Sequence, residues 1–209
     1  MGLISLLFED PGKFLLLAIP LLYSIIIHEL AHGWVAEKMG DSTARWLGRL
    51  SLNPIKHLDP IGTIMLFIFG FGWAKPVPVN FNNLRDFRKG LIFVSAAGIT
   101  ANIIVAFCAL LLLQLLSPYP VSKYLYKVLI ELARINIMLA AFNLIPIPPL
   151  DGSKILMGFT SRSFQYSLAR LEPYGFFIII GLLWIGALNP LIAFFQWIIL
   201  SFIRLLLPG

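Results

Sequence analysis

Charged residues and cysteine are both scarce in this chain of 209 residues. Asp, Glu, Lys and Arg together make up only 12% of it, about half of the roughly 25% that is typical of soluble domains. So few charges could not cover the surface of a folded, water-soluble chain of this size. The 59% share of hydrophobic residues also excludes a disordered chain. The composition therefore indicates an integral membrane protein.

The single cysteine and the charge balance exclude further classes. Cys108 alone can form neither an internal disulfide framework nor a multi-cysteine zinc cluster. The formal net charge is +6, which in a soluble chain could suggest nucleic acid. In a membrane chain, the positions of Lys and Arg instead reflect which loops face the cytoplasm. We therefore expect the lipid bilayer, and no nucleic acid, as partner.

The apolar runs predict several membrane spans. A bilayer core about 30 Å thick needs about 20 apolar residues in a helix. Residues 14–36, 91–116 and 128–145 form such runs, and 174–207 predicts two short tilted spans because Asn189-Pro190 interrupts it. Residues 61–74 are too few for a span and predict a re-entrant or interfacial element. We therefore expect one all-α polytopic membrane domain over 1–209, with about five transmembrane helices, a core over 14–155 and accessory spans over 174–207.

The basic residues predict the orientation of these spans. Most of the 16 Lys and Arg residues lie in 37–90, in 152–172 and at the end of the chain. Cytoplasmic loops carry an excess of Lys and Arg. We therefore expect the N-terminus outside and the C-terminus in the cytoplasm.

Two histidines and a glutamate lie inside the first apolar run. In His28-Glu29-Leu30-Ala31-His32 the histidines are four residues apart, so on a helix both imidazoles lie on one face, where they can share one zinc ion. Glu29 beside them can accept a proton from an attacking water. The alternative is a polar helix end at the lipid interface. Because such side chains are costly within a span unless they are paired or ligated, we favour a metal site.

A catalytic zinc site also needs a third protein ligand. After the other acidic residues are set aside by position, Asp151 and Glu172 remain. Asp151 follows the proline-rich run 146–150 at the inner end of the third span, at the expected depth of the two histidines. Asp151 could instead serve as an ordinary turn residue before Gly152; we favour ligation.

Three motifs together carry a resemblance to a known family. They are His28–His32, the loop run 51–62 (SLNPIKHLDPIG) and the run 143–152 (NLIPIPPLDG). They closely resemble the site-2 protease family, zinc metalloproteases that cut peptide bonds within or beside the membrane. The resemblance covers about residues 14–155. The short link 117–127 leaves no room for the PDZ domain that some members insert, so the chain resembles a minimal branch. The resemblance to a branch of this size without a PDZ domain implies a prokaryotic plasma membrane.

The resemblance implies a role for individual residues. It implies that His28, His32 and Asp151 bind one zinc ion per chain, that Glu29 is the general base, and that Asn143 assists catalysis. The run 96–102 (AAGITAN) looks like the A-G-P-x-x-N element of the family, with Ile99 in place of proline and Asn102 retained.

Three polar residues can each be interpreted in two ways, as structural or as part of the site. Asn143 either caps the end of its own helix or donates its amide N–H to the oxyanion of the scissile carbonyl. Asn102 suits a helix–helix hydrogen bond better than a catalytic role. His57 is either an additional donor near the site or an interfacial loop histidine.

The expected function is that of a zinc-dependent intramembrane endopeptidase. Its substrates would be membrane-spanning or membrane-anchored proteins, cut near the cytoplasmic side. A non-hydrolytic zinc transporter or scaffold is a rival, but the outer halves of the spans have few of the polar residues that a transport pathway needs. A di-iron oxidase would need more than the three histidines present. A prenyl-protein type protease would use Glu172 in place of Asp151.

Residues 73–80 (WAKPVPVN) predict an edge strand that could hold a substrate. A helix must be unwound before its peptide bonds can be attacked, and strand addition is a common way to hold an extended peptide. Pro76 and Pro78 forbid helix and confine the segment to an edge, while Val77 and Val79 favour extended geometry. The alternative is a rigid linker without substrate contact.

Overall fold

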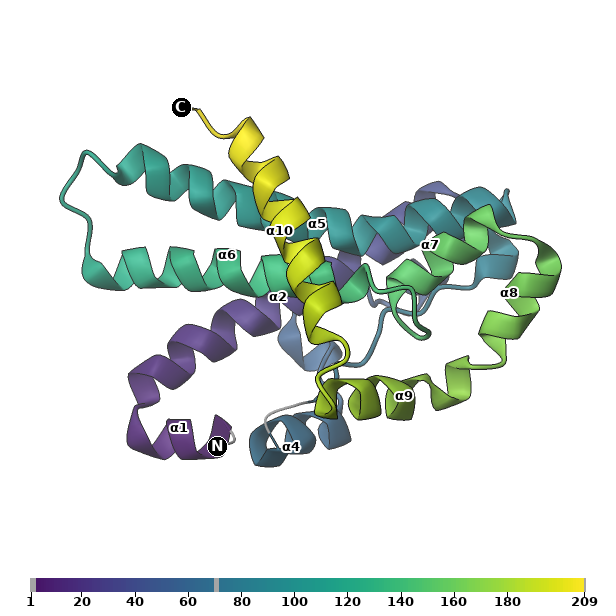
Figure 1. Ribbon diagram of the computed structural model, residues 1–209, viewed down its shortest axis with the longest axis horizontal. Helices are drawn as coiled ribbons and strands as arrows, with labels where there is room; N and C mark the ends of the chain where they lie inside the picture. The colour runs from purple at the N-terminus through teal and green to yellow at the C-terminus, as the bar shows by residue number, and fades with distance from the viewer. Residues whose placement is uncertain (1–2, 70–71, 209) are drawn as a thin grey trace.

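The computed structural model describes residues 3–69 and 72–208, which form helices joined by short connections (Figure 1). The helices are α1 (Leu3–Glu9), α2 (Pro11–Lys38), α3 (Thr43–Trp46), α4 (Pro60–Phe69), α5 (Phe87–Leu116), α6 (Lys123–Asn143), α7 (Asp151–Phe159), α8 (Arg162–Ala169), α9 (Glu172–Trp184) and α10 (Asn189–Leu206). Two 3-10 turns lie at Pro54–Lys56 and Phe81–Asn83. Within the described ranges no β-strand forms, so the all-α class is confirmed.

The centre of the fold is made by α2, α5 and α6. A short turn joins α5 to α6, and the two helices lie antiparallel, with α2 against both (Figure 1). Small side chains are buried where these helices meet, among them Ala106, Ala109, Ala133 and Ala140. Small residues let helix backbones approach closely, which is the usual way helices pack in a membrane.

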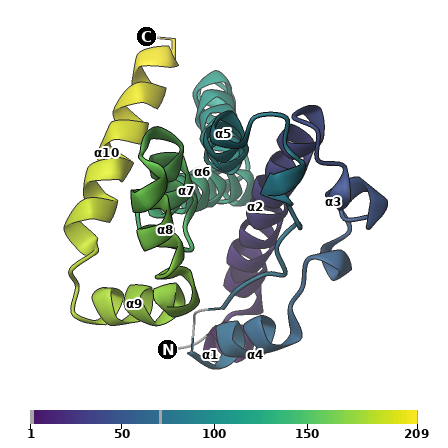
Figure 2. The same ribbon diagram turned by 90° about the vertical axis from the view of Figure 1, so that its right-hand side faces the viewer.

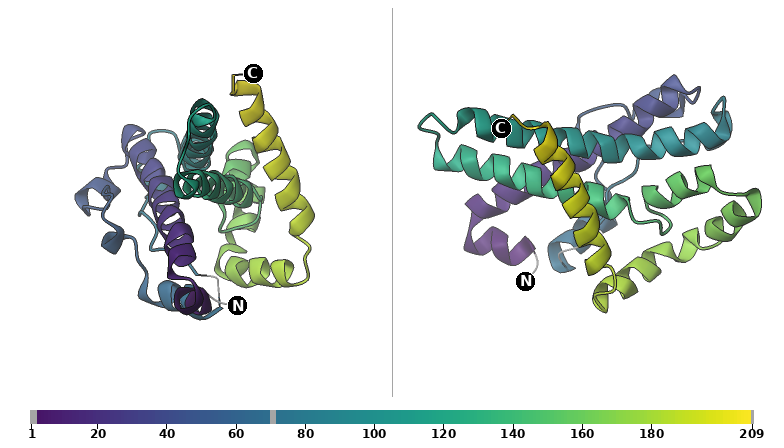
Figure 3. Two further views of the ribbon diagram at one scale, coloured as in Figure 1. Left: turned by 90° about the vertical axis from the view of Figure 1, so that its left-hand side faces the viewer. Right: turned by 45° about the horizontal axis from the view of Figure 1, so that its top comes forward.

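The C-terminal helices cover one side of this centre. Figures 2 and 3 show α8, α9 and α10 on one side of α5 and α6, and α2 and α3 on the other. Ile199 and Ile203 of α10 pack against Ile99 and Ala106 of α5 in one buried cluster. The short helix α7 therefore begins between α2 and the C-terminal helices.

Within residues 3–69 and 72–208, fewer helices than the expected five are long and apolar enough to span a membrane. By length and composition, α2, α5 and α10 qualify, and α8 with α9, bent by 67° at their junction, could add a fourth span. Helix α6 has 21 residues and is long enough to cross a bilayer, but Lys127, Glu131 and Arg134 keep it out of this apolar set. Helix α9 has only 13 residues, about 20 Å of helix. The expected break in the tail does occur: Gly186 adopts a positive φ of 73°, and α10 begins at Asn189.

The segment between α2 and α5 runs back along α2. Phe67 of α4 stacks on Phe14 near the start of α2, with ring centroids 5.9 Å apart. The chain then returns through Ala74–Asn80, which is not helical. The β element expected here is not seen: outside residues 70–71, the pairing consists of one isolated antiparallel bridge between Leu58 and Ala74.

Candidate metal centre and active site

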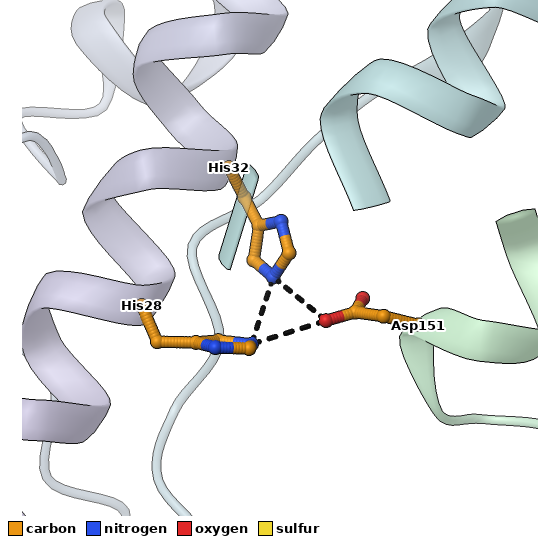
Figure 4. A group of neighbouring side chains, drawn as sticks. All are labelled: His28, His32 and Asp151. Atoms are coloured by element: carbon orange, nitrogen blue, oxygen red, sulfur yellow. Dashed lines mark hydrogen bonds and ion pairs between the residues drawn. The ribbon is translucent and has the colours of Figure 1, made fainter. Parts of the chain in front are cut away.

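His28 and His32 of α2 meet the carboxylate of Asp151 at the start of α7 (Figure 4). The two Nε2 atoms lie 3.0 Å apart, and Oδ2 of Asp151 lies 3.1 Å from Nε2 of His28 and 3.2 Å from Nε2 of His32. All three side chains are buried. The spacing of four residues thus places both imidazoles on one helix face, as the sequence predicts.

The turn before α7 brings Asp151 to α2. It contains a cis peptide bond between Pro148 and Pro149. Gly152 packs against the end of α6 so closely that a Cβ on it would lie 2.3 Å from the carbonyl oxygen of Leu144. A side chain at position 152 would therefore push the turn, and Asp151 with it, away from the histidines.

Each imidazole is held by a second hydrogen bond on its other nitrogen. Nδ1 of His32 lies 2.7 Å from the carbonyl oxygen of Val94, and Nδ1 of His28 lies 2.6 Å from Oδ1 of Asn102. A carbonyl oxygen only accepts, so Nδ1 of neutral His32 carries the proton and its Nε2 has a free lone pair. Metal-binding histidines are commonly oriented by such outer partners.

The donor set fits a zinc ion. Nε2 of His32 and Oδ2 of Asp151 are both acceptors, and two acceptors 3.2 Å apart repel unless a cation lies between them. Ligand atoms of a tetrahedral zinc bound at about 2.0–2.1 Å lie about 3.3 Å apart, close to the distances found here. Gly98 leaves room beside these atoms, because a Cβ added at this position would lie 2.6 Å from Nε2 of both histidines.

Glu29 lies next to this cluster at the wall of a cavity of about 660 Å³. The cavity is lined by the three cluster residues, by Glu29 and Asn143, and by much of the segment 73–79. Oε2 of Glu29 accepts a hydrogen bond of 2.8 Å from the backbone N–H of Val77. A carboxylate, a metal-type cluster and a space for substrate therefore meet at one place.

The segment that contains Val77 is fixed at both ends. Nη2 of Arg49 donates to the carbonyl oxygens of Lys75 (2.8 Å) and Pro76 (3.0 Å). At the other end, Asp41 accepts hydrogen bonds from the backbone N–H of Asn80 (2.7 Å) and from the amide of Asn83 (2.9 Å). Both fixed points come from the chain that follows α2, so the segment is held against the helix that carries Glu29.

The Asp41 carboxylate is buried but well bonded. Burial alone would raise its pKa, but hydrogen bonds from Thr43, Asn83 and Asn80 outweigh burial and hold the pKa of Asp41 below its usual range. The group is therefore an anion that the folded loop stabilises.

The other residues singled out in the sequence lie in different places. Asn143 lines the cavity, while its Nδ2 donates to the carbonyl of Leu139 in its own helix at 3.0 Å. His57 is fully buried in the loop, where its Nε2 contacts the carbonyl of Ser51 at 2.7 Å. It is not among the residues that line the described cavity. Val77 and Val79 both line it.

Glu172, the alternative third ligand, also lines the cavity. It is exposed and, in the part of the chain that the structure describes, it is not in the group of side chains close enough to share a metal. The geometry therefore favours Asp151 over Glu172.

Sequence reasoning missed Asn136 and Asp41. Asn136 is a polar residue in an apolar stretch, which is a recognisable signal. Asp41 carries no such signal, because its importance comes from contacts between distant segments. Gly98 belongs to the run 96–102 that resembles the family, but its close approach to the two histidines was not predicted.

Comparisons with known proteins agree with this geometry. The model of peptidase family M50 matches residues 120–185. A Bacillus subtilis protein named as a candidate zinc metalloprotease, YwhC, is 40% identical over 194 residues, which are 88% of this chain and 85% of the relative. This chain belongs to peptidase family M50. The membership confirms the resemblance to site-2 proteases and makes the chain a zinc metalloprotease by family.

Two other relatives share less of their sequence with this chain. Rip2 of Mycolicibacterium smegmatis, also named as a candidate zinc metalloprotease, is 30% identical over 85% of this chain and 70% of its own length. The zinc metalloprotease MJ0392 of Methanocaldococcus jannaschii is 29% identical over 72% of this chain and 36% of its own length. No solved structure matches the chain significantly.

Proposed function

We propose that this M50 chain is an intramembrane endopeptidase that hydrolyses peptide bonds of membrane-spanning or membrane-anchored proteins. The observation that carries the proposal is the position of Glu29, which lines a cavity of about 660 Å³ together with His28, His32 and Asp151, the group that could hold a metal ion. Because α2 qualifies as a membrane span, a site in its second half would act on a chain at membrane depth.

The proposed roles follow from the chemistry of each side chain. His28, His32 and Asp151 would hold one zinc ion, which when bound polarises the scissile carbonyl and the attacking water. Glu29 accepts the proton of that water and returns it to the leaving amine. Asn143 has a second amide N–H besides the one that Leu139 accepts, and this N–H would stabilise the oxyanion.

The segment 74–80 would hold the substrate as an added strand. In an extended chain, the N–H and C=O groups of alternating residues point to the same side. Pro76 and Pro78 have no N–H, and the carbonyl of Pro76 is bonded to Arg49. The donor left for a substrate is therefore the N–H of Val79, which in an extended segment points to the same side as the Val77 N–H that meets Glu29. This supports strand addition over a linker without substrate contact.

The position of α4 bears on the proposed topology. Its contact with Phe14 places it beside the start of α2, far from the end of α2 where the segment begins. This supports a re-entrant element over one that lies at the interface. With the N-terminus outside and the loops 37–90 on the cytoplasmic side, the site would open toward the cytoplasm.

The substrate class can be tested in cells. Cells carrying Glu29→Gln should accumulate membrane peptides and anchored fragments that wild-type cells degrade, as measured by proteomics of the membrane fraction. The variant keeps the fold and the zinc ligands, so accumulation reports lost hydrolysis. Identical membrane proteomes in the two strains would contradict the proposal and favour a non-hydrolytic zinc protein, whether transporter or scaffold.

A further inference from the structure

Three polar side chains are fully buried between the long helices, away from the cavity. They are Ser24 of α2, Asn102 of α5 and Asn136 of α6, each with no exposed surface. Polar groups buried at membrane depth are costly unless every donor and acceptor has a partner. The partner of every donor and acceptor in this group must therefore be accounted for.

These side chains form one continuous chain of hydrogen bonds that ends at His28. Nδ1 of His28 lies 2.6 Å from Oδ1 of Asn102, and Nδ2 of Asn102 donates to Oδ1 of Asn136 at 2.7 Å. Nδ2 of Asn136 donates to Oγ of Ser24 at 2.7 Å. Oγ of Ser24 in turn donates to the carbonyl of Pro20 at 2.6 Å.

The direction of the chain is set at its far end. The carbonyl of Pro20 can only accept, so the single proton of the Ser24 hydroxyl points to it, and Oγ must accept from Asn136. The Asn136 amide is oriented independently by the carbonyl of Leu132, to which its Nδ2 donates at 2.8 Å. Oδ1 of Asn136 therefore faces Asn102 as an acceptor.

The same reasoning applies to Asn102. Both protons of its Nδ2 are used, one for Asn136 and one for the backbone carbonyl of Ser24 at 3.3 Å. Oδ1 of Asn102 is then left to face His28, and it can only accept. Nδ1 of His28 must therefore be the donor.

We propose that Ser24, Asn136 and Asn102 are positioning residues that hold neutral His28 with its proton on Nδ1. Nε2 of His28 is thereby left unprotonated and directed at Asp151 and His32, as a metal ligand requires. His32 is held in the same tautomer, with its proton on Nδ1, by one backbone carbonyl, that of Val94. The inference rests on the metal site of the proposed function, though not on peptide hydrolysis.

The tautomer can be measured without metal or substrate. The chain has three histidines, so ¹⁵N-histidine NMR of the zinc-free protein in micelles can be assigned with the variants His57→Asn and His32→Asn. At a pH where His28 is neutral, we expect its proton on Nδ1. A proton on Nε2 of His28 would overturn the inference, even if the protein cleaves membrane substrates.

Zinc affinity tests Asn136 directly. Loss of an outer partner of a metal ligand typically lowers metal affinity about 10–100-fold, so we expect Asn136→Leu to weaken zinc binding by about tenfold in a chelator competition. Asn136→Asp should restore much of the affinity, because a protonated carboxyl in this apolar site both accepts from Asn102 and donates to Ser24 or Leu132.

The matched control is Ile137→Ala, which loosens the same helix interface without touching the chain of hydrogen bonds. Ile137 packs against the buried cluster of α5 and α10. We expect this variant to bind zinc as wild type does. An equal loss of affinity in Ile137→Ala, or wild-type affinity in Asn136→Leu, would mean that Asn136 only packs helices. If His28 shows the expected tautomer but no membrane substrate is cleaved, the proposed function fails and the inference stands.

Discussion

The backbone N–H of Val77 donates a hydrogen bond of 2.8 Å to Oε2 of Glu29. The contact joins residues 48 positions apart, one from the helix α2 and one from a non-helical segment. It places the proposed substrate strand directly beside the proposed general base. A peptide that pairs with this segment would therefore have its backbone next to Glu29 and the metal cluster.

Proline substitutions can separate the two roles of this segment. Val79→Pro removes a backbone donor on the proposed substrate side without touching Glu29, so we expect cleavage of a helical membrane peptide to slow by about tenfold, the equivalent of one hydrogen bond of about 1.4 kcal/mol. Val77→Pro instead removes the hydrogen bond that holds Glu29 against the segment, and it too should slow cleavage. Both variants should retain zinc. Unchanged turnover in a folded Val79→Pro protein would leave the linker interpretation.

Gly98→Ala should expel the metal. The added methyl group would lie 2.6 Å from Nε2 of both His28 and His32, in the space where their lone pairs converge. We expect the zinc content per chain, measured by elemental analysis, to fall at least tenfold. Gly181→Ala is the matched control, because a Cβ there meets nothing within 4 Å. Full zinc occupancy in Gly98→Ala would show that the ion does not sit at this cluster.

Asp41 should make the fold sensitive to acid. Its pKa is held below the ordinary value by native hydrogen bonds, so its stabilising contribution is complete above the unfolded pKa of about 3.9 and is lost as the pH falls through the native pKa. Asp41→Asn, which leaves buried donors without an anionic acceptor, should lower the free energy of unfolding at pH 7 by about 1–3 kcal/mol. The difference between the two proteins, followed by thermal unfolding in detergent, should shrink below pH 4. A difference that grows with acid would contradict this role.

The sidedness of the chain can be tested by cysteine labelling in a Cys108→Ser background. Single cysteines at Ser122, Asn82 and Ser161 replace exposed residues. With the N-terminus outside, an impermeant reagent should label intact cells at position 122 only. Labelling from outside at position 82 would mean that the segment 39–86 crosses the membrane, and the proposed orientation would be wrong.

The local motifs were predictable, whereas contacts between distant segments were not. The spacing of His28 and His32 determines their shared helix face, and apolar length determined α2 and α5 to within a few residues of their ends. The count of five spans was not confirmed, because α6 was judged by the apolar residues near its C-terminal end, although Lys127, Glu131 and Arg134 precede them. The strand expected at 73–80 is not part of a sheet. Strand pairing needs a neighbouring strand, and a proline-rich segment has few backbone N–H groups with which to pair.

In the candidate site, too, the local motifs were predictable and the contacts between distant segments were not. Asp151 could be singled out because acidic residues are few and a rigid turn precedes it. The hydrogen bond between Glu29 and Val77, the close approach of Gly98 and the bonds of Asp41 all depend on how α5 and the loop after α2 pack on α2. Nothing in the local sequence of these residues encodes that packing.

The central claim is that Glu29 is the base of a zinc site formed by His28, His32 and Asp151. The most direct test compares purified wild type and Glu29→Gln for zinc per chain and for the rate at which each cleaves a helical membrane peptide. The glutamine can still accept the Val77 N–H, but it cannot take a proton from water. We predict about one zinc per chain in both proteins and a rate at least 100-fold lower in the variant, as expected for loss of a general base. A variant that cleaves at nearly the wild-type rate, or a wild type that is active without zinc, would contradict the claim.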